Sequence, residues 1–200
     1  MNYSMKLITP PSVEPVTVAE AKIYAHIDHD VDDSLIATWI KTARILAESH
    51  QRRAYYEQTW ELSFDGFPGL PLLIPRPPLV RVVSIKYYDY QNTMTSMGLS
   101  DFIIDINHEP GRLTHSYDTT WPTVTLKPID AVRIRFICGF AHYSTTSTTT
   151  YAPDLGDIPD NVKDAIYLYC GFRNENRSGE IVEIPRQFYD LLNQDGFYTP

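Results

Sequence analysis

The sequence predicts an α+β fold in which helices from both ends of the chain pack together beside an antiparallel, β-rich middle. Apolar residues recur every three or four positions near both ends, whereas they alternate with polar residues in the middle. Prolines, glycines and aspartates separate the short apolar runs between residues 58 and 143. The connections between these runs are too short for crossover helices, so the strands should pair antiparallel.

Two helices are predicted in the N-terminal part. Thr17 and Glu20 have the spacing of a capping box, so the first helix should begin near Val18. The second follows the acidic segment 28–33, where Asp30 or Asp32 can cap it. It should end near Arg53, and its predicted buried face is Leu35, Ile36, Trp39, Ile40, Ala43, Leu46, Ala47 and His50. The residues expected to face away from this core are Lys41, Arg44 and Glu48.

Alternating apolar residues predict the strands of the middle region. Trp60, Leu62 and Phe64 indicate a half-buried strand after residue 58. A long strand should start near Leu79, because the preceding prolines cannot donate to a sheet. One side of this strand should carry Leu79, Val83, Ile85 and Tyr87. Shorter strands are predicted at 70–74, 93–97, 102–106, 112–114 and 131–140.

Two further helices are predicted near the C-terminal end. One has Pro159 at its first position, ends near Asn176, and buries Val162, Ala165, Ile166, Tyr169 and Cys170. The last begins near Pro185 and carries Phe188, Leu191 and Leu192. The chain thus divides into an N-terminal helical part (1–57), a β-rich middle (58–143), a Ser/Thr-rich loop (144–157) and a C-terminal helical part with a tail (158–200), the helical parts forming one unit.

The charge balance argues against some functions. The 200 residues include 17 lysines and arginines against 25 aspartates and glutamates, a net charge of -8. Such an acidic chain is a poor candidate for tight, sequence-general DNA binding. No apolar run has the length of a membrane span and no signal-peptide core is visible, so we expect a soluble intracellular protein without a membrane partner. Cys138 and Cys170 lie in apolar patterns typical of buried thiols.

The sharpest candidate for chemistry is the group His26, Asp28 and His29, whose side chains could hold a divalent metal. The alternative is a junction between helices that is rich in capping residues. We favour the junction, because no matching third-ligand motif occurs elsewhere. The chain also lacks a Gly-x-Ser-x-Gly elbow, a phosphate-binding loop and a dinucleotide fingerprint. We therefore predict a protein that is not an enzyme and needs no metal or cofactor.

A row of cations could form a basic stripe on one sheet face among tyrosines, as in platforms that bind single-stranded nucleic acid. Its members would be Arg76, Arg81, Lys86, Arg133 and Arg135. The alternative is a set of ordinary outward strand positions opposite acidic residues, and the acidic composition favours it. A polysaccharide-binding module that uses the tyrosines of the strands is a third possibility.

Many short motifs follow one another between about Pro10 and Leu192. They are Glu14-Pro-Val-Thr-Val-Ala-Glu-Ala21, Asp28-His-Asp30 with Asp33 and Leu35-Ile36, Gln58-Thr-Trp-Glu-Leu62, Phe64-Asp-Gly-Phe-Pro68, Pro75-Arg-Pro-Pro-Leu79, Ser84-Ile-Lys-Tyr-Tyr-Asp89, Pro110-Gly-Arg112, Trp121-Pro122, Val132-Arg-Ile-Arg-Phe136, Gly139, Ile158-Pro159 and Glu175-Asn-Arg177. In this order they resemble the head–tail connector (adaptor) proteins of long-tailed bacteriophages and prophages. The departures are a longer Ser/Thr loop at 144–150 and an aromatic tail after Gln194.

The resemblance implies a structural virion protein, made in the host cytoplasm and located in the neck. Such proteins form a homo-oligomeric ring, commonly a dodecamer, that docks below the portal and extends the DNA channel. The implied partners are other copies of the chain, the portal protein, a stopper or tail-completion protein, and duplex DNA that passes through without sequence-specific binding. An acidic lumen wall suits this role, because it repels phosphate. The alternatives are a tail-side neck component (stopper or tail-completion protein) and a metal-dependent enzyme that uses His26, Asp28 and His29.

We further predict that the segment 188–200 docks on the portal, because its aromatic residues lie on a tail with little core of its own. The predicted contact residues are Phe188, Tyr189, Leu192, Phe197 and Tyr198.

Overall fold

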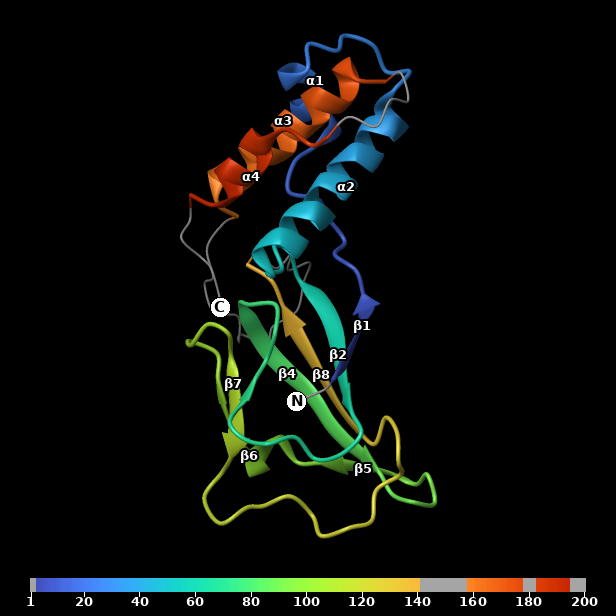
Figure 1. Cartoon of the computed structure of the whole chain (residues 1–200), viewed down its shortest axis with the longest axis vertical. Coiled ribbons are helices and arrows are strands. Elements are labelled where there is room, and N and C mark those ends of the chain that lie inside the picture. Colours follow the sequence, from blue (N-terminus) through green and yellow to red (C-terminus); the bar gives the residue numbers. More distant parts are fainter. Residues whose placement is uncertain (1–2, 141–157, 178–182, 195–200) are drawn as a thin grey trace, which may run out of the picture.

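Helices and strands occupy opposite ends of the molecule's long axis (Figure 1). The structure, a computed structural model, describes residues 3–140, 158–177 and 183–194. The predicted α+β class is confirmed, with helices from both parts of the chain packed together. These helices are α1 (Val18–Tyr24), α2 (Asp33–Gln51), α3 (Asp160–Glu175) and α4 (Arg186–Leu192). A 3-10 turn, η1, covers Leu99–Asp101.

The strands form two antiparallel sheets. A five-stranded sheet has the order β1-β2-β8-β4-β5, and a three-stranded sheet has the order β3-β7-β6. The first contains β1 (Ser4–Thr9), β2 (Gln58–Phe64), β8 (Val132–Cys138), β4 (Leu79–Tyr88) and β5 (Met94–Met97). The second contains β3 (Leu72–Leu73), β7 (Arg112–His115) and β6 (Phe102–Asp105). The predicted antiparallel pairing is confirmed, and β8 pairs in the same sheet as the long strand β4.

Strand β1 is an addition to the predicted elements. It pairs with β2 at the edge of the larger sheet, so the N-terminal part is not helical throughout. None of its six residues is buried, and its register with β2 shifts between Leu7 and Thr9. An edge strand without a buried side produces little apolar alternation, which explains why the sequence pattern does not reveal it.

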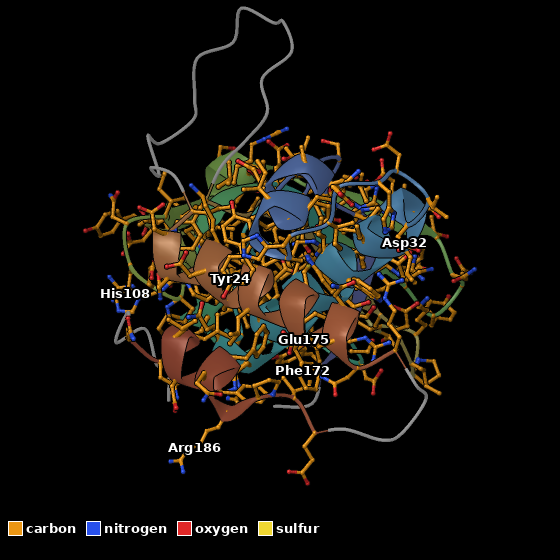
Figure 2. The ribbon with its side chains drawn as sticks, turned by 90° about the horizontal axis from the view of Figure 1, so that it is seen from above. Tyr24, Asp32, His108, Phe172, Glu175 and Arg186 are labelled. Carbon is orange, nitrogen blue, oxygen red and sulfur yellow. The ribbon has the colours of Figure 1, made fainter. Side chains whose placement is uncertain are left out.

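The helical layer is centred on α3, which contacts α1, α2 and α4 (Figure 2). The predicted buried face of α3 is confirmed, although Pro159 precedes the helix as its N-cap. The capping box of α1 is also confirmed, because the Thr17 hydroxyl accepts the Glu20 amide at 3.2 Å and the Glu20 carboxylate accepts the Thr17 amide at 2.7 Å. Asp32 is the N-cap of α2, but its side chain makes no capping hydrogen bond.

A second core lies between the two sheets, and it is separate from the helical core. Strand β4 enters this core with a different set of residues than its simple alternation predicts. Leu79, Val82 and Ile85 are buried, whereas Val83 is only half-buried. The pairing of β4 with β8 shifts register twice, and each extra residue rotates the following side chains to the other face. The prediction for Val83 is therefore wrong.

Candidate functional site

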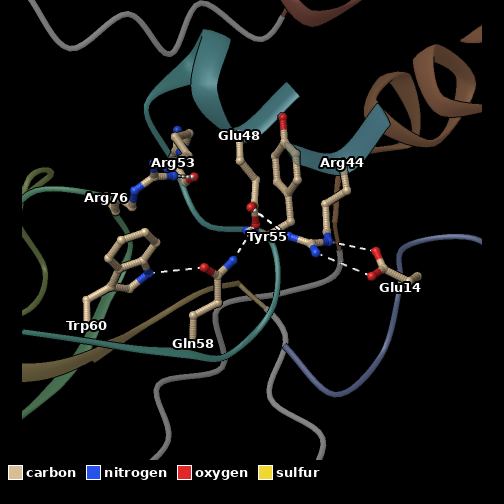
Figure 3. Close-up of polar contacts among 8 residues, drawn as sticks. All are labelled: Glu14, Arg44, Glu48, Arg53, Tyr55, Gln58, Trp60 and Arg76. Atoms are coloured by element: carbon tan, nitrogen blue, oxygen red, sulfur yellow. Dashed lines mark hydrogen bonds and ion pairs between the residues drawn. The ribbon is translucent and has the colours of Figure 1, made fainter. Parts of the chain in front are cut away.

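A buried polar network lies where the helical layer meets the sheets (Figure 3). Its centre is Glu48 near the end of α2, whose side chain is only 5% exposed. The Glu48 carboxylate accepts a hydrogen bond from Arg44 Nη1 at 2.8 Å and another from the Tyr55 backbone amide at 3.1 Å. It also accepts from the side-chain amide of Gln58 at the start of β2. One carboxylate thus binds a helix, the following loop and a strand.

The network continues in two directions from Glu48. Arg44 donates through Nε to Glu14 Oε2 at 2.6 Å, which ties the segment before α1 to α2. Gln58 Oε1 accepts from the indole nitrogen of Trp60 at 3.0 Å, and the guanidinium of Arg76 lies 4.5 Å from the centre of the Trp60 ring.

Arg44 and Glu48 were expected to face away from the core, and this prediction is wrong. Both residues are 4% exposed. Burial raises the pKa of Glu48, against the opposing effects of Arg44 and the Tyr55 amide. Burial by itself would lower the pKa of Arg44, but Glu14 and Glu48 raise it above its ordinary value. Two charges inside the protein are stable only because each has hydrogen-bonded partners. The only sequence signal for this buried pair is the spacing of four residues between opposite charges. Pairs with this spacing are more often found on the surface of a helix.

The last helix is attached to the same junction. Gln51 Nε2 donates to the Leu192 carbonyl at 2.5 Å, and the Tyr55 hydroxyl donates to Gln51 Oε1 at 2.7 Å. His50 Nε2 lies 2.8 Å from Asn193 Oδ1. The position of α4 is therefore set by the same residues that join α2 to β2.

The predicted portal-docking residues differ in how deeply they are buried. Phe188 and Leu192 are 0% and 2% exposed and belong to the helical core, so the premise that this segment has little core of its own is wrong for them. Tyr189 is half-buried, with its ring centre 5.0 Å from that of His50. Phe197 and Tyr198 lie outside the described residues, as does the Ser/Thr segment 144–157.

The candidate metal ligands His26, Asp28 and His29, which we had weighed against a helix junction, do not form a ligand cluster. Within the described residues, no three histidine, cysteine, aspartate or glutamate side chains gather closely enough to hold a metal ion. The acidic segment instead connects α1 to α2, because Lys22 Nζ binds Asp30 at 2.5 Å and Asp33 at 2.9 Å. These contacts match the junction that we favoured.

Both thiols are buried, as predicted. Cys138 and Cys170 are 0% and 1% exposed. Burial raises the pKa of Cys170 to about 12, and it raises the pKa of Cys138 still further. These cysteines are therefore protonated at neutral pH and are poor nucleophiles.

The cations that were considered as a basic stripe, although the alternative was favoured, lie only partly together. Arg135 Nη2 lies 2.7 Å from Glu61, and Arg133 pairs with Asp130, so these two arginines lie opposite acidic residues as the favoured alternative required. Arg76 is not part of the stripe, because it precedes β4 and packs on Trp60.

The structure also forms a groove of about 480 Å³ between β1, the end of α2 and the segment before β4. It is lined by Tyr3, Met5, Ser49, Arg52, Leu73, Pro75, Arg76, Pro77 and Pro110. No sequence motif indicated it, because its walls come from four separate segments. In the part of the chain that the structure describes, no helix is long and apolar enough to cross a membrane.

Comparison with known proteins finds solved structures with a similar fold, but no similar sequence. No protein-family model and no curated protein matches the sequence. Solved structures of gene transfer agent (GTA) particles do match: a chain in the neck of an empty GTA particle computed with C6 symmetry has a TM-score of 0.73 at 15% identity, covering 98% of this chain and 96% of that chain. A chain in the virion of the native GTA particle has a TM-score of 0.71 at 15% identity, and the match covers 94% of this chain and 93% of that chain. A chain in the neck of the native GTA particle, computed with C12 symmetry, has a TM-score of 0.64 at 15% identity, and the match covers 98% of this chain and 96% of that chain.

Proposed function

We propose that the protein is a structural component of the neck of a phage-like particle, where it acts as a head–tail connector. The observation that carries this proposal is the likeness, over nearly the whole of both chains, to chains in the necks of GTA particles. The order of sequence motifs points to the same role independently. In this proposal, copies of the chain form a ring below the portal, extend the DNA channel and provide a landing surface for the tail or a stopper.

A ring is supported by the C6 and C12 symmetries of the matched necks. A cyclic ring requires a heterologous interface, in which one patch of each copy meets a different patch of its neighbour. Such an interface needs subunits that keep their shape. The network around Glu48 and the ties between α2 and α4 supply that rigidity by fixing the helical layer to the sheets.

The net charge of -8 suits a DNA conduit. Duplex DNA carries a dense array of phosphates, so an acidic wall repels it and opposes tight binding. The polymer can then slide through the ring during packaging or release. A cationic wall would bind the same polymer and slow it.

We keep the proposal that the C-terminal segment contacts the portal, now with Tyr189, Phe197 and Tyr198 as the contact residues. Phe188 and Leu192 support the contact from inside the helical core. Truncation after Asn193 should weaken binding to purified portal rings while leaving both helical and β cores intact. Unchanged affinity of the truncated chain would contradict docking by the tail, though not the neck role.

The experiment that tests the function mixes the purified protein with isolated portal rings and, separately, with isolated tails. Electron microscopy should show a ring of added density on the portal. Binding to tails alone would instead support the tail-side alternative, a stopper or tail-completion protein. Binding to neither would overturn the neck proposal.

A further inference from the structure

The outward side of the five-stranded sheet carries a cluster of cations, which we call the basic face. Residues paired across antiparallel strands share a face of the sheet. In one row, Lys6 pairs with Glu61, which pairs in turn with Arg135. In the next row, Arg133 pairs with Lys86. The cations of the basic face are Lys6, Arg81, Lys86, Lys127, Arg133 and Arg135.

The acids on this face are too few to neutralise it. Glu61 and Asp130 are the carboxylates that pair with its cations, and Arg135, Arg133 and Lys127 share them. Among the described residues, three cations of the face make no ion pair. They are Lys6, Arg81 and Lys86. The face therefore carries a surplus of positive charge on a chain whose net charge is -8.

Several of these cations are already held in place. The Tyr88 ring has Lys127 Nζ at 4.1 Å from its centre and the Arg133 guanidinium at 5.1 Å. The side chains of Arg133 and Arg135 are still 34% and 39% exposed. Cations that are ordered and exposed before binding lose little conformational entropy when a partner arrives, so they favour a specific contact.

The rest of the chain has the opposite charge. The whole chain has 17 lysines and arginines and 25 aspartates and glutamates. Outside the basic face, with its six cations and two acids, 11 cations and 23 acids remain. Outside the basic face, acids therefore outnumber cations about two to one, and a neighbouring copy offers carboxylates that can pair with the face. Duplex DNA is the other polyanion near a neck protein, but a basic face toward the lumen would bind phosphates and oppose sliding.

We propose that the basic face binds an acidic surface of the adjacent copy and so forms one half of the heterologous contact that closes the ring. This inference rests on the proposed ring. Opposite charges across an interface steer the approach of the partners and fix their register, and like charges in contact are strongly unfavourable. The ring contact should therefore weaken as salt increases.

Zero-length carbodiimide cross-linking tests the contact directly. Rings are assembled from an equal mixture of ¹⁴N- and ¹⁵N-labelled chain, on portal rings if the protein does not assemble alone. We expect mixed-isotope cross-links from Lys6 or Lys86 to aspartates or glutamates, which also identify the acidic partner surface. Rings without such cross-links would overturn the proposal.

Charge reversal gives a second, independent readout. The double variant Arg81→Glu with Lys86→Glu should raise the concentration needed for assembly by more than about tenfold. The matched control is Lys41→Glu with Arg173→Glu, two exposed cations on α2 and α3. It changes the charge equally and should assemble as the natural chain does. Circular dichroism melting verifies that both variants fold.

The outcomes separate this inference from the proposed function. Normal assembly of the Arg81→Glu, Lys86→Glu variant would overturn the basic-face contact and leave the ring standing. Failure of the natural chain to form a ring in solution or on portal would overturn both. Binding of a labelled DNA duplex at physiological salt, lost in the same variant, would assign the face to DNA and overturn the contact between copies.

Discussion

At the scale of single residues, Glu48 combines burial with a charge. A carboxyl group whose pKa is higher in the folded protein than in the unfolded chain binds protons more tightly when folded. Its stabilising effect is therefore complete below the unfolded pKa and is lost as the pH rises through the folded pKa. Burial raises the pKa of Glu48 above the ordinary value of 4.5, so the pH range over which this stabilising effect is lost lies above pH 4.5.

The variant Glu48→Gln should remove this pH dependence, because the amide does not titrate. As the pH rises from 4.5 toward 7, the unfolding free energy of the natural chain should fall relative to that of Glu48→Gln. A difference of one pH unit between the folded and unfolded pKa corresponds to about 1.4 kcal/mol. Urea unfolding over a pH series measures it, with the exposed Glu57→Gln as control. Parallel curves for the natural chain and Glu48→Gln would show that the pKa of Glu48 is not raised.

Gly139 follows β8 in a backbone conformation that L-amino acids rarely adopt, with φ at +136°. A Cβ at this position would overlap the backbone carbon and oxygen of Tyr56. Gly139→Ala should therefore lower the unfolding free energy by about 3 kcal/mol or more. Gly66→Ala is the matched control, because a Cβ there has no heavy atom within 4 Å. Equal unfolding midpoints for the two variants would contradict the predicted close approach.

At the scale of elements, α1 depends on its cap more than the longer helices do. It has seven residues and buries only Ala21, so packing contributes little. Thr17→Ala should lower the unfolding free energy by about 1 kcal/mol, because it leaves the Glu20 amide in the first turn without its acceptor. Thr17→Ser keeps the hydroxyl and should retain most of the stability. Thermal unfolding of both variants checks this, and faster amide exchange confined to α1 in Thr17→Ala would locate the effect. A neutral Thr17→Ala would show that the capping box adds nothing measurable.

At the scale of the whole molecule, two separate cores are joined by one polar junction. The helical core and the sheet core share the segment from α2 to β2, where Glu48 binds Tyr55 and Gln58. We expect the chain to unfold in a single transition, because loss of either core leaves buried charges at this junction unpaired. Far-UV circular dichroism follows the helices, and the fluorescence of the tryptophans follows both cores.

Coincident unfolding midpoints from the two probes are the expected result. Gln58→Ala removes the link from the sheet to Glu48 and also the acceptor for Trp60, so it should separate the two transitions. Thr59→Ala, at the next position on the same strand, serves as its control. Separate transitions in the natural chain would show that the junction does not couple the cores.

The same molecule shows where sequence patterns predict structure well and where they fail. The buried face of α3, the capping box of Thr17 and the strand at Gln58–Phe64 were predicted because each is encoded by neighbouring residues. Strand β1 was missed because an edge strand buries nothing, and the inward residues of β4 were shifted by two bulges that alternation does not encode.

By itself the sequence determined the helices, the strands other than β1, the α+β class, the acidic charge and the motif order that suggested a neck protein. The tertiary structure alone decided which charges are inside and which gather on a surface. Arg44 and Glu48 have the spacing of an exposed helical pair, yet they are buried because Glu14 from before α1 and Gln58 from the start of β2 pack against them. The basic face likewise exists only because strand register brings Lys6, Lys86 and Arg135 together. Contacts between residues far apart in sequence depend on how the elements pack, and that information is absent from any local pattern.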